Sequence, residues 1–185
     1  ENLETYNAFE ESISHFEKLF RIDPKIIASD LHPNYLATRY GVARAEKENK
    51  KLLLIQHHHA HLAACIAENR PSLKSPIIGL CFDGTGLGTD QAIWGGEVLI
   101  GNLTHYNRRF HLKYVPLPGG DITIRIPARM ALTHLWSNNI DWDTAFPPAL
   151  ELCVEEKTAL RIQLTKGINS PPTSSMGRLF DAVAS

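Results

Sequence analysis

Four of the nine histidines in this chain of 185 residues lie within five positions: His57, His58, His59 and His61. The run follows an apolar, strand-like segment at residues 51–55 and leads into an alanine-rich helical pattern. If the helix begins within the histidines, His57 and His61 lie four positions apart on one face and can share a metal ion. The other two histidines then have different roles, such as hydrogen bonding or orienting the ligands. A solvated loop or a buried structural cluster is the alternative interpretation.

A second stretch with chemical potential starts at Asp83, directly after an apolar strand pattern at residues 77–82. Asp83 places a carboxylate one strand after the histidines and is therefore a candidate third metal ligand. The next residues are candidates to line phosphates: Gly84, Thr85, Gly86, Gly88, Thr89 and Asp90.

A strand followed by Asp-Gly-Thr-Gly is typical of actin/Hsp70-type ATPase folds, which wrap such a turn around phosphates. Glycines let the backbone approach the ligand, and the threonines can donate hydrogen bonds. The stretch is neither a Walker A loop nor a dinucleotide-binding fingerprint. Residues 92–100 resemble a returning strand, so a simple hairpin turn is the competing interpretation, and both can hold together.

Two other places offer weaker signals. Asp30 and His32 follow a strand pattern at residues 26–30, where open α/β sheets place ligand contacts, although Asp30 could equally start a turn that caps the next helix. Arg125 and Arg129 are four positions apart and could grip an anion, or could lie on a solvated helix face.

The composition is that of an ordinary globular domain. The net charge is −1, which favours neither a nucleic-acid groove nor a membrane surface, and no apolar run approaches the roughly 20 residues that span a bilayer. We expect no signal peptide and a cytoplasmic location. The three cysteines, which form no Cys-x-x-Cys pair, are predicted to be buried free thiols: Cys65, Cys81 and Cys153.

Strand and helix patterns alternate along the chain, which predicts an α/β fold. Helices are expected at residues 1–22, 34–48, about 57–69, 127–137, 150–166 and from 176 onward. Strands are expected at residues 26–30, 51–55, 77–82, 92–100, 103–106 and 111–115. Because the last helical pattern is still running at Ser185, we interpret the chain as a fragment.

Six motifs together resemble the HypF family of hydrogenase-maturation carbamoyltransferases, in order and over nearly the whole chain. They occupy residues 29–33, 56–61, 82–90, 93–97, 116–121 and 173–184. The resemblance implies that residues 1–185 form a single partial domain, the threonylcarbamoyltransferase-like carbamoyl-transfer region, with an actin/Hsp70-like (ASKHA, RNase H-like) fold.

The resemblance also implies a reaction. Carbamoyl phosphate and ATP would give carbamoyl adenylate, and the carbamoyl group would pass to the C-terminal cysteine of a HypE-type partner. The product is a precursor of the cyanide ligands of [NiFe] hydrogenase. Iron or zinc would be bound in the protein, and magnesium is a further candidate ion. No nucleic acid or membrane would take part.

Particular residues acquire roles from this resemblance. His57, His61 and Asp83 match metal ligands, and residues 84–90 would line the phosphates. Gly119, Gly120 and Asp121 would contribute to the nucleotide or carbamoyl pocket, and the residues that would face the substrate, together with Asp83, are Arg178 and Asp181. Ile126 and Ala128 depart from the family pattern, which has a charge and an aromatic there, so local packing or a ligand contact is in question.

The same resemblance implies that much of the family's chain is absent, including an aspartate that completes the metal site. We therefore expect this piece to hold three of four metal ligands and to be inactive alone. The alternatives are a tRNA threonylcarbamoyladenosine transferase, a small-molecule O-carbamoyltransferase, and a non-catalytic module that binds metal or nucleotide.

Overall fold

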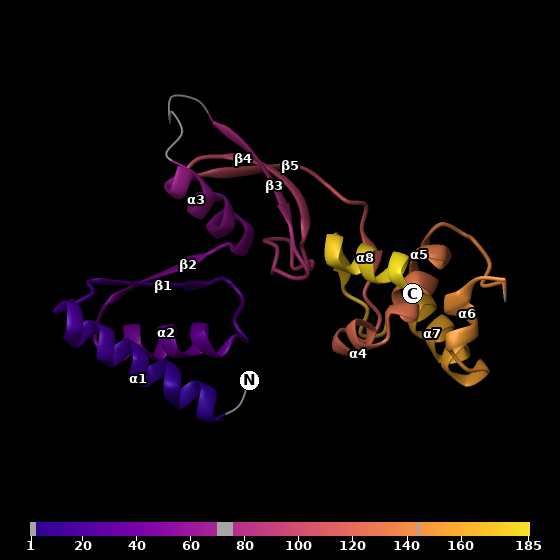
Figure 1. Ribbon diagram of the computed structural model, residues 1–185, viewed down its shortest axis with the longest axis horizontal. Coiled ribbons are helices and arrows are strands. Elements are labelled where there is room, and N and C mark those ends of the chain that lie inside the picture. Colours follow the sequence, from indigo (N-terminus) through magenta and orange to yellow (C-terminus); the bar gives the residue numbers. More distant parts are fainter. Residues whose placement is uncertain (1–2, 70–75, 144) are drawn as a thin grey trace. The chain divides into compact units, whose positions relative to one another are not determined.

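The computed structural model describes residues 3–69, 76–143 and 145–185. The chain forms two compact units, Glu1–Ile55 and Gln56–Ser185. Each unit combines helices with strands (Figure 1), so the predicted α/β class is confirmed. The assignment of residues 1–185 to one partial domain stays a prediction. None of the described helices is long and apolar enough to cross a membrane.

The first unit is a parallel strand pair joined by a helix. β1 (Ile26–Asp30) and β2 (Lys51–Ile55) pair in register from Ile26 opposite Lys51 to Asp30 opposite Ile55. Parallel strands need a crossover connection, which α2 (Leu36–Lys47) supplies. The preceding helix, α1 (Leu3–Phe20), is tied to α2 by an ion pair of 2.8 Å between Glu17 and Arg44.

Asp30 and His32 form a local turn after β1. A carboxylate oxygen of Asp30 accepts the backbone N–H of His32 at 2.7 Å, and the His32 ring stacks on Tyr35 with centroids 4.3 Å apart. The N-cap of α2 is Tyr35, without a side-chain hydrogen bond, so Asp30 starts the turn but does not cap the helix. These contacts favour the structural interpretation of the pair.

The second unit opens with α3 (His57–Asn69), which packs on an antiparallel sheet (Figure 1). The sheet has the order β3 (Ile77–Phe82), β4 (Gly96–Gly101) and β5 (Tyr106–His111). The prediction of separate strands at residues 103–106 and 111–115 was wrong. The Asn102 side chain accepts the backbone N–H groups of Thr104 and His105, both at 2.9 Å, so residues 102–105 form a turn. The core beneath α3 consists of Leu62, Ile66, Cys81 and Leu99.

The rest of the second unit is mainly helical. Its elements are β6 (Val115–Pro116), α4 (Asp121–Arg125), α5 (Pro127–Ser137), α6 (Pro147–Glu151), α7 (Val154–Lys166), β7 (Pro172–Thr173) and α8 (Met176–Ala184). The predicted helix at residues 150–166 is two helices, because Cys153 is extended and forms a capping box with Glu156 at the start of α7. Ala128, where the family has an aromatic residue, is fully buried in a core that contains Trp142.

The cysteines are free thiols, but the prediction that all three are buried was wrong. Cys65 and Cys153 are exposed, the latter because it occupies the N-cap of α7. Cys81 is buried under α3, and this burial raises the pKa of its thiol to about 11. Cys81 is therefore a protonated thiol at neutral pH.

A candidate metal centre beside a glycine-rich turn

The helix α3 begins at His57, so the predicted placement of the histidine pair on one helix face is confirmed. One turn of helix separates His57 from His61, and their Nε2 atoms lie 3.1 Å apart. The His57 side chain is 26% exposed and that of His61 is 63% exposed, which leaves both accessible to an ion from solution. The sequence spacing alone therefore creates half of a possible metal site.

Asp83 completes a three-ligand cluster. It follows β3 directly, and its Oδ2 atom lies 3.1 Å from Nε2 of His57 and 3.8 Å from Nε2 of His61. The three donor atoms all lie within 4.8 Å of one another. Donor atoms that bind one ion at roughly 2.0–2.2 Å lie roughly 3.0–3.5 Å apart, so two of the three separations already fit and the third is slightly wide. Two imidazoles and a carboxylate suit zinc or non-haem iron.

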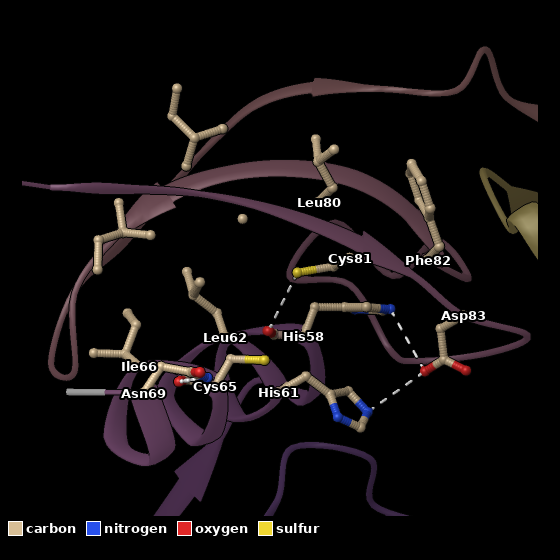
Figure 2. Close-up of a pocket in the computed structure, with 13 residues that line it drawn as sticks. His58, His61, Leu62, Cys65, Ile66, Asn69, Leu80, Cys81, Phe82 and Asp83 are labelled. Atoms are coloured by element: carbon tan, nitrogen blue, oxygen red, sulfur yellow. Dashed lines mark hydrogen bonds and ion pairs between the residues drawn. The ribbon is translucent and has the colours of Figure 1, made fainter. Parts of the chain in front are cut away.

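A cavity of about 640 Å³ adjoins this cluster (Figure 2). His61 and Asp83 form its polar end, and their side chains point toward each other in Figure 2. Most of its remaining wall comes from apolar side chains of α3 and β3, including Leu62, Ile66 and Phe82. The volume is in the range of small-molecule sites in proteins.

The other two histidines have different environments. The His58 side chain is fully buried, its Nε2 lies 3.8 Å from Oδ2 of Asp83, and burial lowers its pKa. The Nε2 atom of His59 lies 3.0 Å from the carbonyl oxygen of Asn102, and its ring packs on Tyr106 with centroids 4.8 Å apart. His59 therefore ties α3 to the turn between β4 and β5, a structural role.

The glycines after Asp83 serve different purposes. A Cβ atom at Gly86 would lie 2.5 Å from Cε1 of His58, and one at Gly88 would lie 2.0 Å from Nε1 of Trp94. Gly84 is open, with only the Nη2 atom of Arg178 nearby, at 3.6 Å from such a Cβ. Packing therefore requires glycine at the two later positions, while Gly84 leaves the space beside it unfilled. The backbone N–H of Gly84 itself donates to Oδ1 of Asp83 at 2.6 Å. The predicted hydrogen-bond donors of this turn, Thr85 and Thr89, are exposed.

Asp90, predicted to line the phosphates, is held by donors within the protein. Its Oδ1 accepts Nε1–H of Trp94 at 2.8 Å, and its Oδ2 accepts the hydroxyl of Tyr114 at 2.6 Å and Nη1 of Arg108 at 3.1 Å. Although burial opposes it, these hydrogen bonds lower the pKa of Asp90. The structure thus gives Asp90 a role in fixing the turn, and nucleotide contact stays a prediction.

A buried glutamate in β4 anchors the other end of the same turn. The Glu97 side chain is fully buried and accepts Nε–H of Arg108 at 2.5 Å, and the Arg108 guanidinium stacks over Trp94 at 4.0 Å from the ring centroid. This pair was not predicted from the sequence. Its signal was a lone acidic residue in an otherwise apolar strand, which needs a cation when buried.

The N-terminus of α8 contacts Asp83 and Gly84 directly. The Ser175 hydroxyl lies 3.0 Å from the carbonyl oxygen of Asp83 and 2.8 Å from that of Gly84, and it also caps α8 by accepting N–H of Arg178. The Arg178 side chain, 11% exposed, pairs with Asp181 at 3.1 Å. The structure therefore brings Arg178 to Gly84. The role of Ser175 in holding this turn was not predicted from the sequence.

Gly119, Gly120 and Asp121 lie at the start of α4, and Gly119 is attached to the turn that follows α7. The N–H of Gly119 donates to the carbonyl of Asn169 at 2.7 Å, and both glycines have positive φ angles, +85° and +54°. No Cβ contact would arise within 4 Å at Gly120, so its backbone is accessible. Asp121 is exposed, and its predicted ligand contact stays a prediction.

The interpretation of Arg125 and Arg129 as one helical anion grip was wrong. Pro127 starts a new helix, so Arg125 ends α4 while Arg129 belongs to α5. Arg129 is 8% exposed and donates to the side chain of Gln163 at 2.8 Å and to the carbonyl of Pro118 at 3.4 Å. Burial lowers its pKa, and the guanidinium holds the loop before α4.

Comparison with known protein families accounts for both halves of the chain. The family described as "Carbamoyltransferase, Kae1-like Domain, second subdomain" matches residues 79–185, and the one described as "HypF Kae1-like domain" matches residues 1–68. The chain belongs to the HypF family. The family resemblance inferred from the six motifs is thereby confirmed.

Relatives in this family are much longer than the chain. The carbamoyltransferase HypF of Rhodobacter capsulatus is 42% identical over 183 residues, which is 97% of this chain and 24% of the relative. The crystal structure of full-length HypF in the phosphate- and nucleotide-bound form matches 100% of this chain and 23% of its own, with a TM-score of 0.89 and 39% identity. The T. kodakarensis HypF structure matches 99% of this chain and 25% of its own, with a TM-score of 0.83 and 35% identity. The chain thus spans about a quarter of these relatives.

Proposed function

We propose that this chain is the metal- and nucleotide-holding part of a HypF-type carbamoyltransferase with an actin/Hsp70-like fold. The observation that carries the proposal is the cluster of His57, His61 and Asp83, with its donor atoms within 4.8 Å of one another. Membership of the HypF family supports the reaction class, and the similar full-length HypF is described in a phosphate- and nucleotide-bound form.

In this proposal the cluster holds iron or zinc through the Nε2 atoms of His57 and His61 and a carboxylate oxygen of Asp83. The bound ion would supply Lewis-acid chemistry to phosphate and carbamoyl oxygens. The chain's own residues position the substrate. Gly84, which has no side chain, leaves room for a phosphate to approach, and Arg178, placed beside it, offers positive charge for charge-assisted hydrogen bonds.

The proposed substrates are ATP, with magnesium, and carbamoyl phosphate, which together with one water give carbamoyl adenylate and release pyrophosphate and phosphate. In the transfer step, the thiolate sulfur of the C-terminal cysteine of a HypE-type acceptor attacks the carbamoyl carbon. A carbon–sulfur bond forms, the bond between that carbon and the AMP phosphate oxygen breaks, and AMP leaves. The thiol proton is lost to the surroundings. This would place the protein in the maturation of the cyanide ligands of [NiFe] hydrogenase.

Metal content is the measurement that tests the proposal first. We expect the purified protein to contain close to one equivalent of iron or zinc by elemental analysis, and the His57→Ala/His61→Ala variant to lose it. A matched control, His105→Ala/His111→Ala, removes two exposed histidines from the β4–β5 region and should keep the metal. If the wild-type protein binds neither metal, even when supplied in excess, the proposed metal centre is refuted.

Carbamoyl transfer is tested separately. Because we expect the 185-residue chain to be inactive alone, a full-length HypF-type protein that contains this segment is incubated with ATP, carbamoyl phosphate and a HypE-type acceptor, and the mass of the acceptor's C-terminal peptide is measured. A carbamoyl adduct that requires the acceptor cysteine supports the proposal. An adduct on tRNA or on a small-molecule hydroxyl, with none on the acceptor, would instead favour the other transferase classes.

A further inference from the structure

The ring of His58 presents a buried polar atom that the mechanism above leaves unused. Its side chain is fully buried, and among the described residues its Nε2 atom has no hydrogen-bond partner. Buried polar side-chain atoms are nearly always hydrogen-bonded, so such an exception calls for a physical reason. Oδ2 of Asp83 lies 3.8 Å from this Nε2 atom, and Figure 2 shows the His58 ring directed toward that carboxylate.

The side chain of Gln56 determines which nitrogen of His58 carries the proton. Oε1 of Gln56 accepts the backbone N–H of His59 at 2.9 Å, and its Nε2 donates to the carbonyl of Leu87 at 3.2 Å. A flipped amide would set oxygen against oxygen and N–H against N–H, so these two contacts fix its orientation. The same amide nitrogen lies 3.2 Å from Nδ1 of His58.

Because Gln56 presents a donor, Nδ1 of His58 must be the acceptor. The neutral ring then carries its single proton on Nε2, the atom that faces Asp83. A nitrogen that bears a proton has no free lone pair for a metal ion. His58 is thereby excluded as a ligand and left as a hydrogen-bond donor to the carboxylate.

Packing holds the ring in this orientation. A Cβ atom at Gly86 would lie 2.5 Å from Cε1 of His58, so the glycine backbone lies directly against the ring, and Trp94 packs at 6.1 Å between centroids. The thiol of Cys81 donates to the backbone carbonyl of His58 at 3.6 Å. The donor is thus preorganised before any ligand arrives.

We propose that His58 is a positioning residue whose Nε2–H, fixed by Gln56, donates to the Asp83 carboxylate and aims it at His57 and His61. The inference rests on the proposed metal centre. The 3.8 Å separation is longer than the roughly 2.7–3.2 Å of an N–H···O hydrogen bond, and contacts of this kind tighten when the site is filled. Replacing a residue that hydrogen-bonds to a metal ligand commonly lowers metal affinity by roughly 10–100-fold.

Two measurements on the purified protein test the proposal. The first is the tautomer of His58 in the metal-free protein, read from long-range ¹H–¹⁵N correlations of the ring. We expect an unprotonated Nδ1 and a protonated Nε2. A proton on Nδ1 overturns the proposal whatever the variants do.

The second measurement is zinc affinity, titrated against a competing chelator. His58→Leu should weaken binding by roughly 10–100-fold while one zinc still binds, and His58→Gln, which keeps an N–H donor, should recover part of the loss. The adjacent control His59→Gln should bind zinc like the wild type. Circular dichroism checks that each variant is folded.

The outcomes separate this inference from the proposed function. If the wild type binds zinc and both His58 variants bind it equally well, His58 does not position the ligand and this inference alone falls. If His58→Leu lowers the stoichiometry and His58→Gln restores nothing, His58 is itself a ligand and the inference also falls. A wild type that binds neither zinc nor iron refutes the metal centre, and with it the role of His58 toward an ion.

Discussion

Replacing Glu97 with glutamine should destabilise the second unit far more than its small chemical change suggests. The Glu97 carboxylate is fully buried and accepts hydrogen bonds from four donors, which are the backbone N–H groups of Gly95 and Gly96, the Ser174 hydroxyl and Nε of Arg108. Glutamine retains one acceptor oxygen, but its NH₂ group meets a donor wherever it is placed. The substitution also removes the negative charge that compensates Arg108.

The size of the expected loss in the free energy of unfolding follows from the environment of the Arg108 guanidinium. Removing one partner of a buried ion pair costs about 3–5 kcal/mol. Arg108 is 15% exposed, keeps Asp90 at 3.1 Å and remains stacked on Trp94, so the lower end applies. We therefore expect a loss of about 3 kcal/mol in the free energy of unfolding, and a fall in melting temperature on the order of 10 °C.

Urea unfolding, monitored by tryptophan fluorescence, measures this loss of stability in the second unit, which contains Glu97. All three tryptophans lie in the second unit, so the first unit does not contribute to their signal. The control Glu151→Gln makes the same chemical change at an exposed position and should stay within about 0.5 kcal/mol of wild type. In a double-mutant cycle, Arg108→Met and Glu97→Gln should be strongly non-additive. A loss below about 1 kcal/mol, or an additive cycle, would refute the reasoning.

Two other predictions concern packing and protonation. Gly86→Ala should cost about 1–3 kcal/mol and weaken zinc binding, because its Cβ would lie 2.5 Å from a buried ring atom, whereas Gly84→Ala, with its nearest contact at 3.6 Å, should stay within about 1 kcal/mol. Urea unfolding and zinc titration of both variants check this, and equal losses would contradict it. Burial lowers the pKa of His134, so the folded protein favours the neutral form of its ring. The contribution of His134 to the free energy of unfolding should therefore decline as pH falls below about 6.5, by at most about 1.4 kcal/mol per pH unit. The stability advantage of wild type over His134→Leu should therefore shrink between pH 7 and pH 5, and a constant difference would contradict the assignment.

Local sequence signals predicted that His57, His61 and Asp83 lie together, because local structure sets their geometry, and the binding of a metal by them stays a prediction. Once α3 starts at His57, the spacing of four brings His61 onto the same face, and Asp83 follows because β3 ends directly before it. The same reasoning located most helices and the strands β1, β2 and β3. The start of α7 at Val154 could be found only by recognising Cys153 as an N-cap, a residue type not normally found there.

The contacts that hold the glycine-rich turn could not be read from the sequence. Glu97 meets Ser174, and Asp90 meets Tyr114, across long stretches of chain, so both depend on tertiary packing. A phosphate motif supplied the expected role for Asp90, yet the structure surrounds its carboxylate with internal donors. The motif predicted the position of the turn correctly. It did not indicate which residues of the turn form hydrogen bonds within the protein and so are engaged by the fold.

Asp83 is restrained from three directions, and this links α8 to the proposed metal centre. Its backbone N–H donates to the carbonyl of Gly95 at 2.8 Å, which fixes it to the far end of the turn. Its carbonyl oxygen accepts N–H of Gly177 at 3.1 Å and the Ser175 hydroxyl at 3.0 Å, both from the start of α8. Its side chain faces three histidines of α3. Because the start of α8 also carries Arg178, a displacement of this helix would move the proposed phosphate contact and a proposed metal ligand together. The proposed metal and nucleotide sites therefore both depend on the position of α8. Substitutions that destabilise the packing of α8 should weaken the binding of metal and of nucleotide together.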